Sequence, residues 1–146
     1  VKESVQPFHI KPHVQESLNW ASNLPEDTSG KDKIFDLGFQ NWGTYIIPEF
    51  AGRPVAHGWN DEGAKNWKPI QELRLLAFFA EPNAVKAHSE LSKLGAKYVL
   101  IYNWYPYQHP WVFQQAFQDN PDLFAKIGEW ESDSAGKIMA FEVLKD

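Results

Sequence analysis

Residues 52–67, GRPVAHGWNDEGAKNW, concentrate side chains that can do chemistry. His57, Asp61 and Glu62 offer nitrogen and oxygen donors for a metal ion, but their spacing matches no recognised ligand pattern. The adjacent carboxylates could also act as an acid and base pair, although such pairs in Gly- and Asn-rich loops commonly form turns. Arg53 could bind an anionic group or backbone carbonyls. We therefore expect no metal site, no cofactor and no catalytic residue, and keep a small soluble hydrolase built on His57, Asp61 and Glu62 as an alternative.

Aromatic side chains gather in residues 102–111, which hold five Trp and Tyr rings. Such rings stack on sugar faces, settle at a membrane headgroup layer or pack against a partner protein. A hydrophobic cluster under a loop would use the same rings, so these alternatives remain open. The candidate ligand-binding residues from these stretches and from a nearby Trp-Gly turn are Trp42, Arg53, His57, Trp59, Asp61, Glu62, Trp104, Tyr105, Tyr107 and His109.

Composition narrows the class of protein. A chain of 146 residues that is 43% hydrophobic and 15% aromatic is expected to fold as a single domain. Its net charge of −5, without a cluster of Lys and Arg, argues against a nucleic-acid partner. The absence of cysteine excludes disulfides, thiolate metal sites and a cysteine nucleophile.

Targeting and membrane signals are also informative. The longest nearly apolar run, residues 73–80, is shorter than the roughly 20 residues that cross a bilayer. The chain opens at Val1 without the apolar core of a signal peptide. We therefore expect a fragment or processed product without a transmembrane helix, in which residues 1–12 form an extended linker.

Apolar periodicity predicts the elements that position these residues. Helical spacing is expected in residues 14–21, 69–80, 82–94 and 110–117, and strands are expected in residues 33–37, 53–57, 96–102, 124–131 and 137–144. The strand at 96–102 has no polar alternation and should be central, whereas the last two strands should form a half-buried antiparallel hairpin. His88 lies on the apolar side of a predicted helix and should pack in the protein core. The fold class is α/β, a layered sandwich with a mixed central sheet, flanking helices and a C-terminal antiparallel hairpin.

The Trp-bearing loops follow three of these strands. If strands 33–37, 53–57 and 96–102 run parallel, the loops FQNWG, GWNDEGAKNW and NWYPYQHPW emerge at one edge of the sheet. Open α/β sheets bind ligands outside the carboxyl ends of their strands. The sequence therefore predicts a shared Trp-rich surface at that edge.

The order of several stretches carries a family resemblance. They are SLNWASNLPEDTSGKDKIFDLG, a Trp-Gly turn, IIPEFAGRPVAHGW, ELSKLGAKYVLIY, DLFAKIGEWE and KIMAFEVLKD. Across residues 13–144 the chain resembles the soluble extracytoplasmic domain of multi-pass, GT-C-type membrane glycosyltransferases and related polytopic membrane proteins. A Gly-Arg-Pro corner at residues 52–54 and a Leu-Gly-x-x-Tyr-Val step at residues 94–99 match features of such domains.

Oligosaccharyltransferase catalytic subunits are the best understood proteins that the chain resembles. Their soluble domain reads the acceptor sequon with a Trp-Trp-Asp-Tyr-Gly motif, whereas residues 40–43 here have one tryptophan and no aspartate. Sequon recognition is therefore not carried over. The family's catalytic acidic residues lie in loops between membrane helices, so the resemblance implies that this chain alone is not an enzyme, although its parent would be a glycosyltransferase.

The resemblance implies a non-catalytic accessory domain on the extracytoplasmic face of a membrane. Its partners would be the transmembrane portion of the parent chain and a glycan, a lipid-linked sugar or an acceptor. Two alternatives stay open: an independent carbohydrate- or protein-binding module, and the small hydrolase described above.

Overall fold

The computed structural model of the chain describes residues 12–23, 33–36, 67–79, 81–103, 109–132 and 136–145. The predicted strand 53–57 and nearly all of the predicted linker 1–12 lie outside these residues, and Pro12 is the first residue of a helix. The elements follow in the order α1 (Pro12–Ser22), β1 (Lys33–Asp36), α3 (Trp67–Phe78), α4 (Ala84–Lys93), β2 (Ala96–Asn103), the 3-10 helix η3 (His109–Val112), α5 (Phe113–Gln118), β3 (Phe124–Ser132) and β4 (Gly136–Val143).

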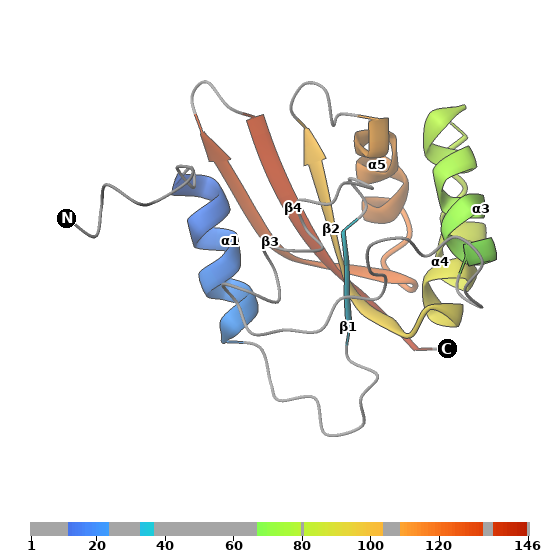
Figure 1. Ribbon diagram of the computed structural model, residues 1–146, viewed down its shortest axis with the longest axis horizontal. Coiled ribbons are helices and arrows are strands. Elements are labelled where there is room, and N and C mark those ends of the chain that lie inside the picture. The colour runs from blue at the N-terminus through green and yellow to red at the C-terminus, as the bar shows by residue number, and fades with distance from the viewer. Residues whose placement is uncertain are drawn as a thin grey trace.

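The strands form one mixed sheet in the order β1-β2-β4-β3 (Figure 1). β1 pairs with β2 in parallel, while β2 with β4 and β4 with β3 are antiparallel pairs. β3 and β4 form the predicted C-terminal hairpin. The α/β fold class with a mixed central sheet is therefore confirmed.

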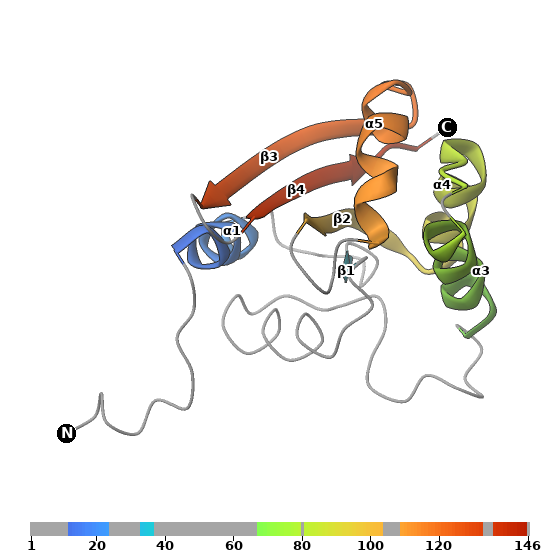
Figure 2. The same cartoon turned by 90° about the horizontal axis from the view of Figure 1, so that it is seen from above.

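Helices cover both faces of the sheet. In both Figure 1 and Figure 2, which are perpendicular views, α1 lies on the left, and α3, α4 and α5 lie on the right. Trp20 of α1 packs against Tyr98 of β2, whereas the next strand residue, Val99, belongs to the core beneath the other helices. Successive strand residues point to opposite faces, so the domain has three layers.

The face toward α3, α4 and α5 carries the larger core. Its centre is a series of phenylalanine rings from α5, β3 and β4, in which Phe117 stacks on Phe124 with ring centroids 3.8 Å apart. Aliphatic residues of α3, α4 and β2 surround these rings. The buried members of this core are Ile70, Leu73, Leu76, Ala77, Ala84, Ala87, Leu91, Leu94, Ala96, Val99, Ile101, Phe113, Phe117, Phe124, Met139, Phe141 and Val143.

The opposite face is sealed by aromatic contacts with α1. The Trp20 ring lies 6.0 Å from Tyr98 and 5.4 Å from Trp130, measured between centroids. The Trp130 ring in turn folds back over Gly128, where an added Cβ atom would lie only 2.4 Å from the ring atom Cη2. The space under this ring exists because residue 128 has no side chain.

The predicted half-buried pattern of the last strand is wrong. Ile138, Met139, Ala140 and Phe141 are all buried, although they point alternately to the two faces. The reason is the place of β4 in the sheet, between β2 and β3 with helices on both faces. The prediction for β2 is confirmed, since Tyr98, Val99, Leu100 and Ile101 are buried as well.

Helix α4 is defined by local signals at both ends. The Asn83 side chain caps its start by accepting a hydrogen bond of 3.0 Å from the Lys86 N–H. Gly95, with φ of 73°, follows its end and turns the chain directly into β2. Both positions explain why the helix and the strand predicted here match the structure closely.

His88 packs within the core, as predicted. It is buried on α4, and its ring meets Phe124 edge-on with centroids 5.6 Å apart. Its Nε2–H donates to the Leu144 carbonyl at 2.5 Å, and the Leu144 N–H donates to Leu123 at 2.9 Å. His88 thereby fixes the chain that leaves β4.

Candidate ligand site at the carboxyl edge of the sheet

Most of the predicted site residues lie outside the described part of the chain. Only His109 falls within it, and its backbone opens η3. The others remain predictions: Trp42, Arg53, His57, Trp59, Asp61, Glu62, Trp104, Tyr105 and Tyr107. The site is therefore built here from the elements that frame the predicted edge.

The parallel pairing of β1 and β2 brings two carboxyl ends to the same edge of the sheet. Ile34, Phe35 and Asp36 of β1 lie opposite Tyr98, Val99 and Leu100 of β2, and β2 continues to Asn103. The predicted edge is confirmed for these two strands, and the strand at 53–57 stays a prediction. Parallel strand ends of this kind commonly border ligand sites in α/β sheets.

A row of three polar side chains crosses this edge. Asn103 of β2 lies opposite Lys137 of β4, and Lys137 lies opposite Glu131 of β3. Directly opposed residues in neighbouring strands share one face, so the three side chains lie side by side. We call Asn103, Lys137 and Glu131 the carboxyl-edge row.

Charge in the row is balanced. The Lys137 ammonium lies 3.2 Å from Glu131 Oε2, and both side chains remain substantially exposed, at 45% and 61%. Exposed pairs of this type contribute about 0–1 kcal/mol to folding. Their hydrogen-bonding capacity therefore remains available without any large cost to stability.

A β-bulge places these carboxylates on their face of the sheet. The register of β3 against β4 shifts between Lys126 and Gly128, which leaves Ile127 as an additional residue. Lys126 and Glu129 consequently point to the same face although they are three residues apart, and their charged atoms lie 3.0 Å apart. Without the bulge, residues three apart in a strand would point to opposite faces.

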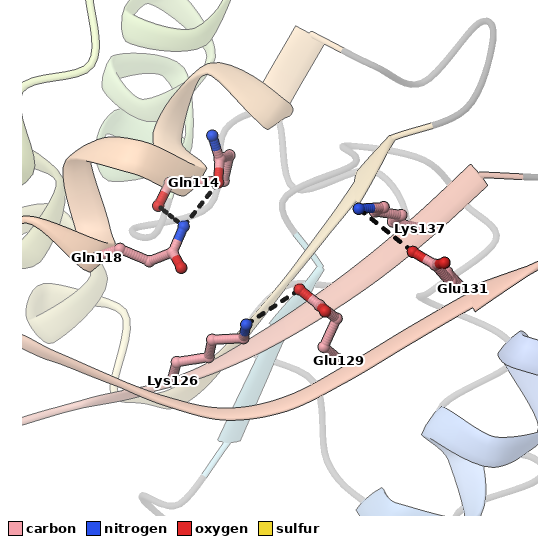
Figure 3. Close-up of polar contacts among 6 residues, drawn as sticks. All are labelled: Gln114, Gln118, Lys126, Glu129, Glu131 and Lys137. Atoms are coloured by element: carbon pink, nitrogen blue, oxygen red, sulfur yellow. Dashed lines mark hydrogen bonds and ion pairs between the residues drawn. The ribbon is translucent and has the colours of Figure 1, made fainter.

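Two ion pairs therefore lie along the same hairpin face. Figure 3 shows the Lys126–Glu129 and Lys137–Glu131 pairs together with Gln114 and Gln118 of α5. The Gln118 side chain donates to the Gln114 side chain at 2.6 Å. This part of the hairpin face is polar and exposed, in contrast to the phenylalanine core of the same face.

An aromatic element borders the carboxyl edge. η3 contacts β2, and its Trp111 is partly buried against the core. Among the described residues, no group of three or more His, Cys, Asp or Glu side chains is placed to hold a metal ion. The chemistry that the described edge offers is therefore hydrogen bonding beside a Trp-bearing element.

Sequence reasoning missed the carboxyl-edge row. Asn103, Glu131 and Lys137 come from three separate segments, and none belongs to a recognised motif. Only Asn103 had a usable signal, since it ends the predicted strand that precedes the aromatic stretch. The other two join it through the antiparallel register of β4, which a single sequence does not reveal.

The fold is similar to that of a globular domain of known structure. The match is the C-terminal globular domain of oligosaccharyltransferase from Archaeoglobus fulgidus, with a TM-score of 0.57 and 13% sequence identity over 94% of this chain and 100% of that chain. No family model and no curated protein sequence matches the chain. At this identity the similarity establishes the fold alone.

Within the described residues, none of the helices has the length and apolar character needed to span a bilayer.

Proposed function

We propose that this chain is a non-catalytic, extracytoplasmic accessory domain of an oligosaccharyltransferase-like membrane glycosyltransferase. The observation that carries the proposal is the fold match, because it extends over the whole of the other domain and nearly the whole of this chain. The ordered sequence stretches that resemble the same class of domain support it independently. Its partners would be the transmembrane portion of the parent chain and a glycan, a lipid-linked sugar or an acceptor.

The proposed role is positioning rather than chemistry. The part of the chain that the structure describes offers paired surface charges and aromatic packing at the carboxyl edge. In the proposed family the catalytic acidic residues lie in extracytoplasmic loops between membrane helices. An accessory domain of this kind changes the affinity for a substrate, and so acts mainly on KM.

The first test examines the parent protein. We expect the gene that encodes this chain to encode several apolar segments of about 20 residues as well. We also expect the full-length protein to stay in the membrane fraction after alkaline extraction. A parent with only a secretory signal would contradict the proposal and favour an independent binding module.

The second test measures the contribution of the domain to glycosyl transfer. Membranes with the full-length parent should transfer a lipid-linked oligosaccharide to an Asn-x-Thr peptide, and replacement of residues 12–145 by a flexible linker should lower kcat/KM at least tenfold, or about 1.4 kcal/mol. The surface variant Lys126→Met serves as a matched control that should retain full activity. Undiminished transfer by the linker variant would refute the accessory role.

A further inference from the structure

We propose that the carboxyl-edge row, Asn103, Lys137 and Glu131, binds hydroxyl groups of a neutral carbohydrate. This inference deepens one part of the proposed function, the contact with a glycan, and it concerns the chain itself whether or not a membrane parent exists. It rests on the register of three strands, the charge balance of the row and the aromatic element beside it.

The row supplies the donors and acceptors that a sugar requires. An ammonium offers only donors, a carboxylate only acceptors, and an amide both. Neighbouring strands lie about 4.8 Å apart, so the three groups present alternating hydrogen-bond character across a short distance. Each sugar hydroxyl both donates and accepts, which matches a mixed row better than a cluster of like charges.

The state of each side chain leaves capacity for a ligand. Lys137 and Glu131 pair through one carboxylate oxygen, and their side chains remain 45% and 61% exposed. The Asn103 side chain is partly buried and makes no hydrogen bond to the other described residues. A ligand can therefore bond to all three groups without breaking the ion pair, and charged partners strengthen such bonds.

Charge balance indicates a neutral ligand. Because Lys137 and Glu131 neutralise each other at 3.2 Å, the row presents no net field that would favour an anion. A phosphate or carboxylate at Lys137 would also be repelled by the neighbouring Glu131 carboxylate. A polyhydroxyl compound meets neither obstacle.

Aromatic surface near the row fits the same ligand class. η3 contacts β2 and carries the partly buried Trp111. Flat rings provide the apolar stacking surface that sugar rings use in addition to hydrogen bonds. A Trp-bearing element in contact with β2 distinguishes this edge from a simple charged surface.

The same hairpin contains a matched comparison. Lys126 and Glu129 form an ion pair of 3.0 Å on the same face, but the residues opposite them in β4 are Phe141 and Met139. That pair has the chemistry of the row without a polar residue on the neighbouring strand. Substitutions there test whether any surface ion pair would give the same result.

The experiment is a titration of the 146-residue chain labelled with ¹⁵N. Chitotriose and maltotriose are added to about 10 mM, a concentration that detects millimolar binding, and inorganic phosphate is the anionic probe. We expect at least one saccharide to shift the backbone amides of Asn103, Glu131 and Lys137, and phosphate to shift none of them. Asn103→Ala, Glu131→Gln and Lys137→Met should each weaken binding about tenfold, or about 1.4 kcal/mol.

The control variants are Lys126→Met and Glu129→Gln, which should change the affinity less than twofold. Amide spectra of every variant report whether the fold is retained, so lost binding can be separated from unfolding. The proposal is overturned if neither saccharide shifts the row, if phosphate binds there instead, or if both sets of variants weaken binding equally. Shifts confined to the exposed Leu75, Phe79 and Val85 of α3 and its neighbourhood would overturn it too.

Failure of this experiment leaves the membrane proposal intact, because that proposal is judged by the parent protein and its transfer activity. The other outcome is saccharide binding by a chain whose parent protein has no membrane segments. It would support the row and refute the membrane assignment.

Discussion

The two faces of the sheet are packed in different ways. Toward α5, the Phe117 ring contacts Phe113, Phe124 and Phe141 at centroid distances of 5.2, 3.8 and 5.3 Å. Toward α1, the Trp20 ring contacts Trp130 and Tyr98 at 5.4 and 6.0 Å. The first face joins several helices and strands through one buried cluster, whereas α1 is the one helix that covers the second face among the described residues.

This difference separates global from local stability. Loss of a central ring on the α5 face removes contacts that three elements share, so the whole domain should respond. Loss of packing under α1 affects one helix and the space above Gly128. Local opening of single elements at lower free energy than global unfolding is a general property of proteins.

The largest effect is expected for Phe117→Ala. Truncation of a fully buried phenylalanine commonly costs about 3–5 kcal/mol, because both transfer free energy and a cavity are involved. Denaturant unfolding followed by far-UV circular dichroism should show a loss of this size. Phe117→Leu is the control and should cost clearly less; a loss below about 1 kcal/mol for Phe117→Ala would contradict the central role of this ring.

An intermediate effect is expected for Gly128→Ala. The new methyl group would meet the Trp130 ring at 2.4 Å, so the ring must move and its contact with Trp20 must change. We expect a cost of about 1–3 kcal/mol in the free energy of unfolding and faster hydrogen exchange in α1.

A double-mutant cycle tests the cause of that cost. In a Trp130→Ala background the methyl group meets no ring, and alanine is favoured over glycine in a strand by about 0.5–1 kcal/mol. Gly128→Ala should then be neutral or stabilising. An unchanged cost in both backgrounds would show that the strain lies in the backbone rather than in the ring.

The smallest effects are expected at the two ion pairs. Lys126→Met and Lys137→Met should each change the free energy of unfolding by less than about 1 kcal/mol, because both pairs are exposed. Raising the salt concentration from 0.1 to 1 M should reduce even this difference through screening. A larger loss for Lys137→Met alone would assign that lysine a structural role and distinguish the two ends of the hairpin.

The order of the described helices and strands could be predicted because local signals mark it. Asn83 and Gly95 delimit α4, and the apolar run after Gly95 predicts β2 directly. The burial of β4 could not be predicted, since its alternating pattern suits either a half-buried or a central strand. Strand order, which decides between the two, depends on long-range pairing with β2.

The sequence predicted the edge of the sheet at which the candidate site lies, but it did not predict the residues of the carboxyl-edge row. Trp104 and Tyr105 drew attention to the end of β2 because their types are conspicuous in the sequence. Lys137 and Glu131 are ordinary residues in a hairpin, and their place beside Asn103 follows from register alone. A site assembled from several strands has no signature in any one of them.

Ile127 is the extra residue of the β-bulge in β3, and it changes which residues of the strand face each side of the sheet. Before the bulge, the even-numbered Lys126 points to the phenylalanine side of the sheet. After it, the odd-numbered residues Glu129 and Glu131 point to that side. Deleting Ile127 would join Lys126 to Gly128 in a regular strand, so Trp130 would still point toward α1 and Glu131 toward the phenylalanines, whereas a regular strand that kept Ile127 without the bulge would reverse both. The bulge therefore lets β3 carry one additional residue while the aromatic contacts with α1 and the carboxyl-edge row stay on opposite sides of the same strand.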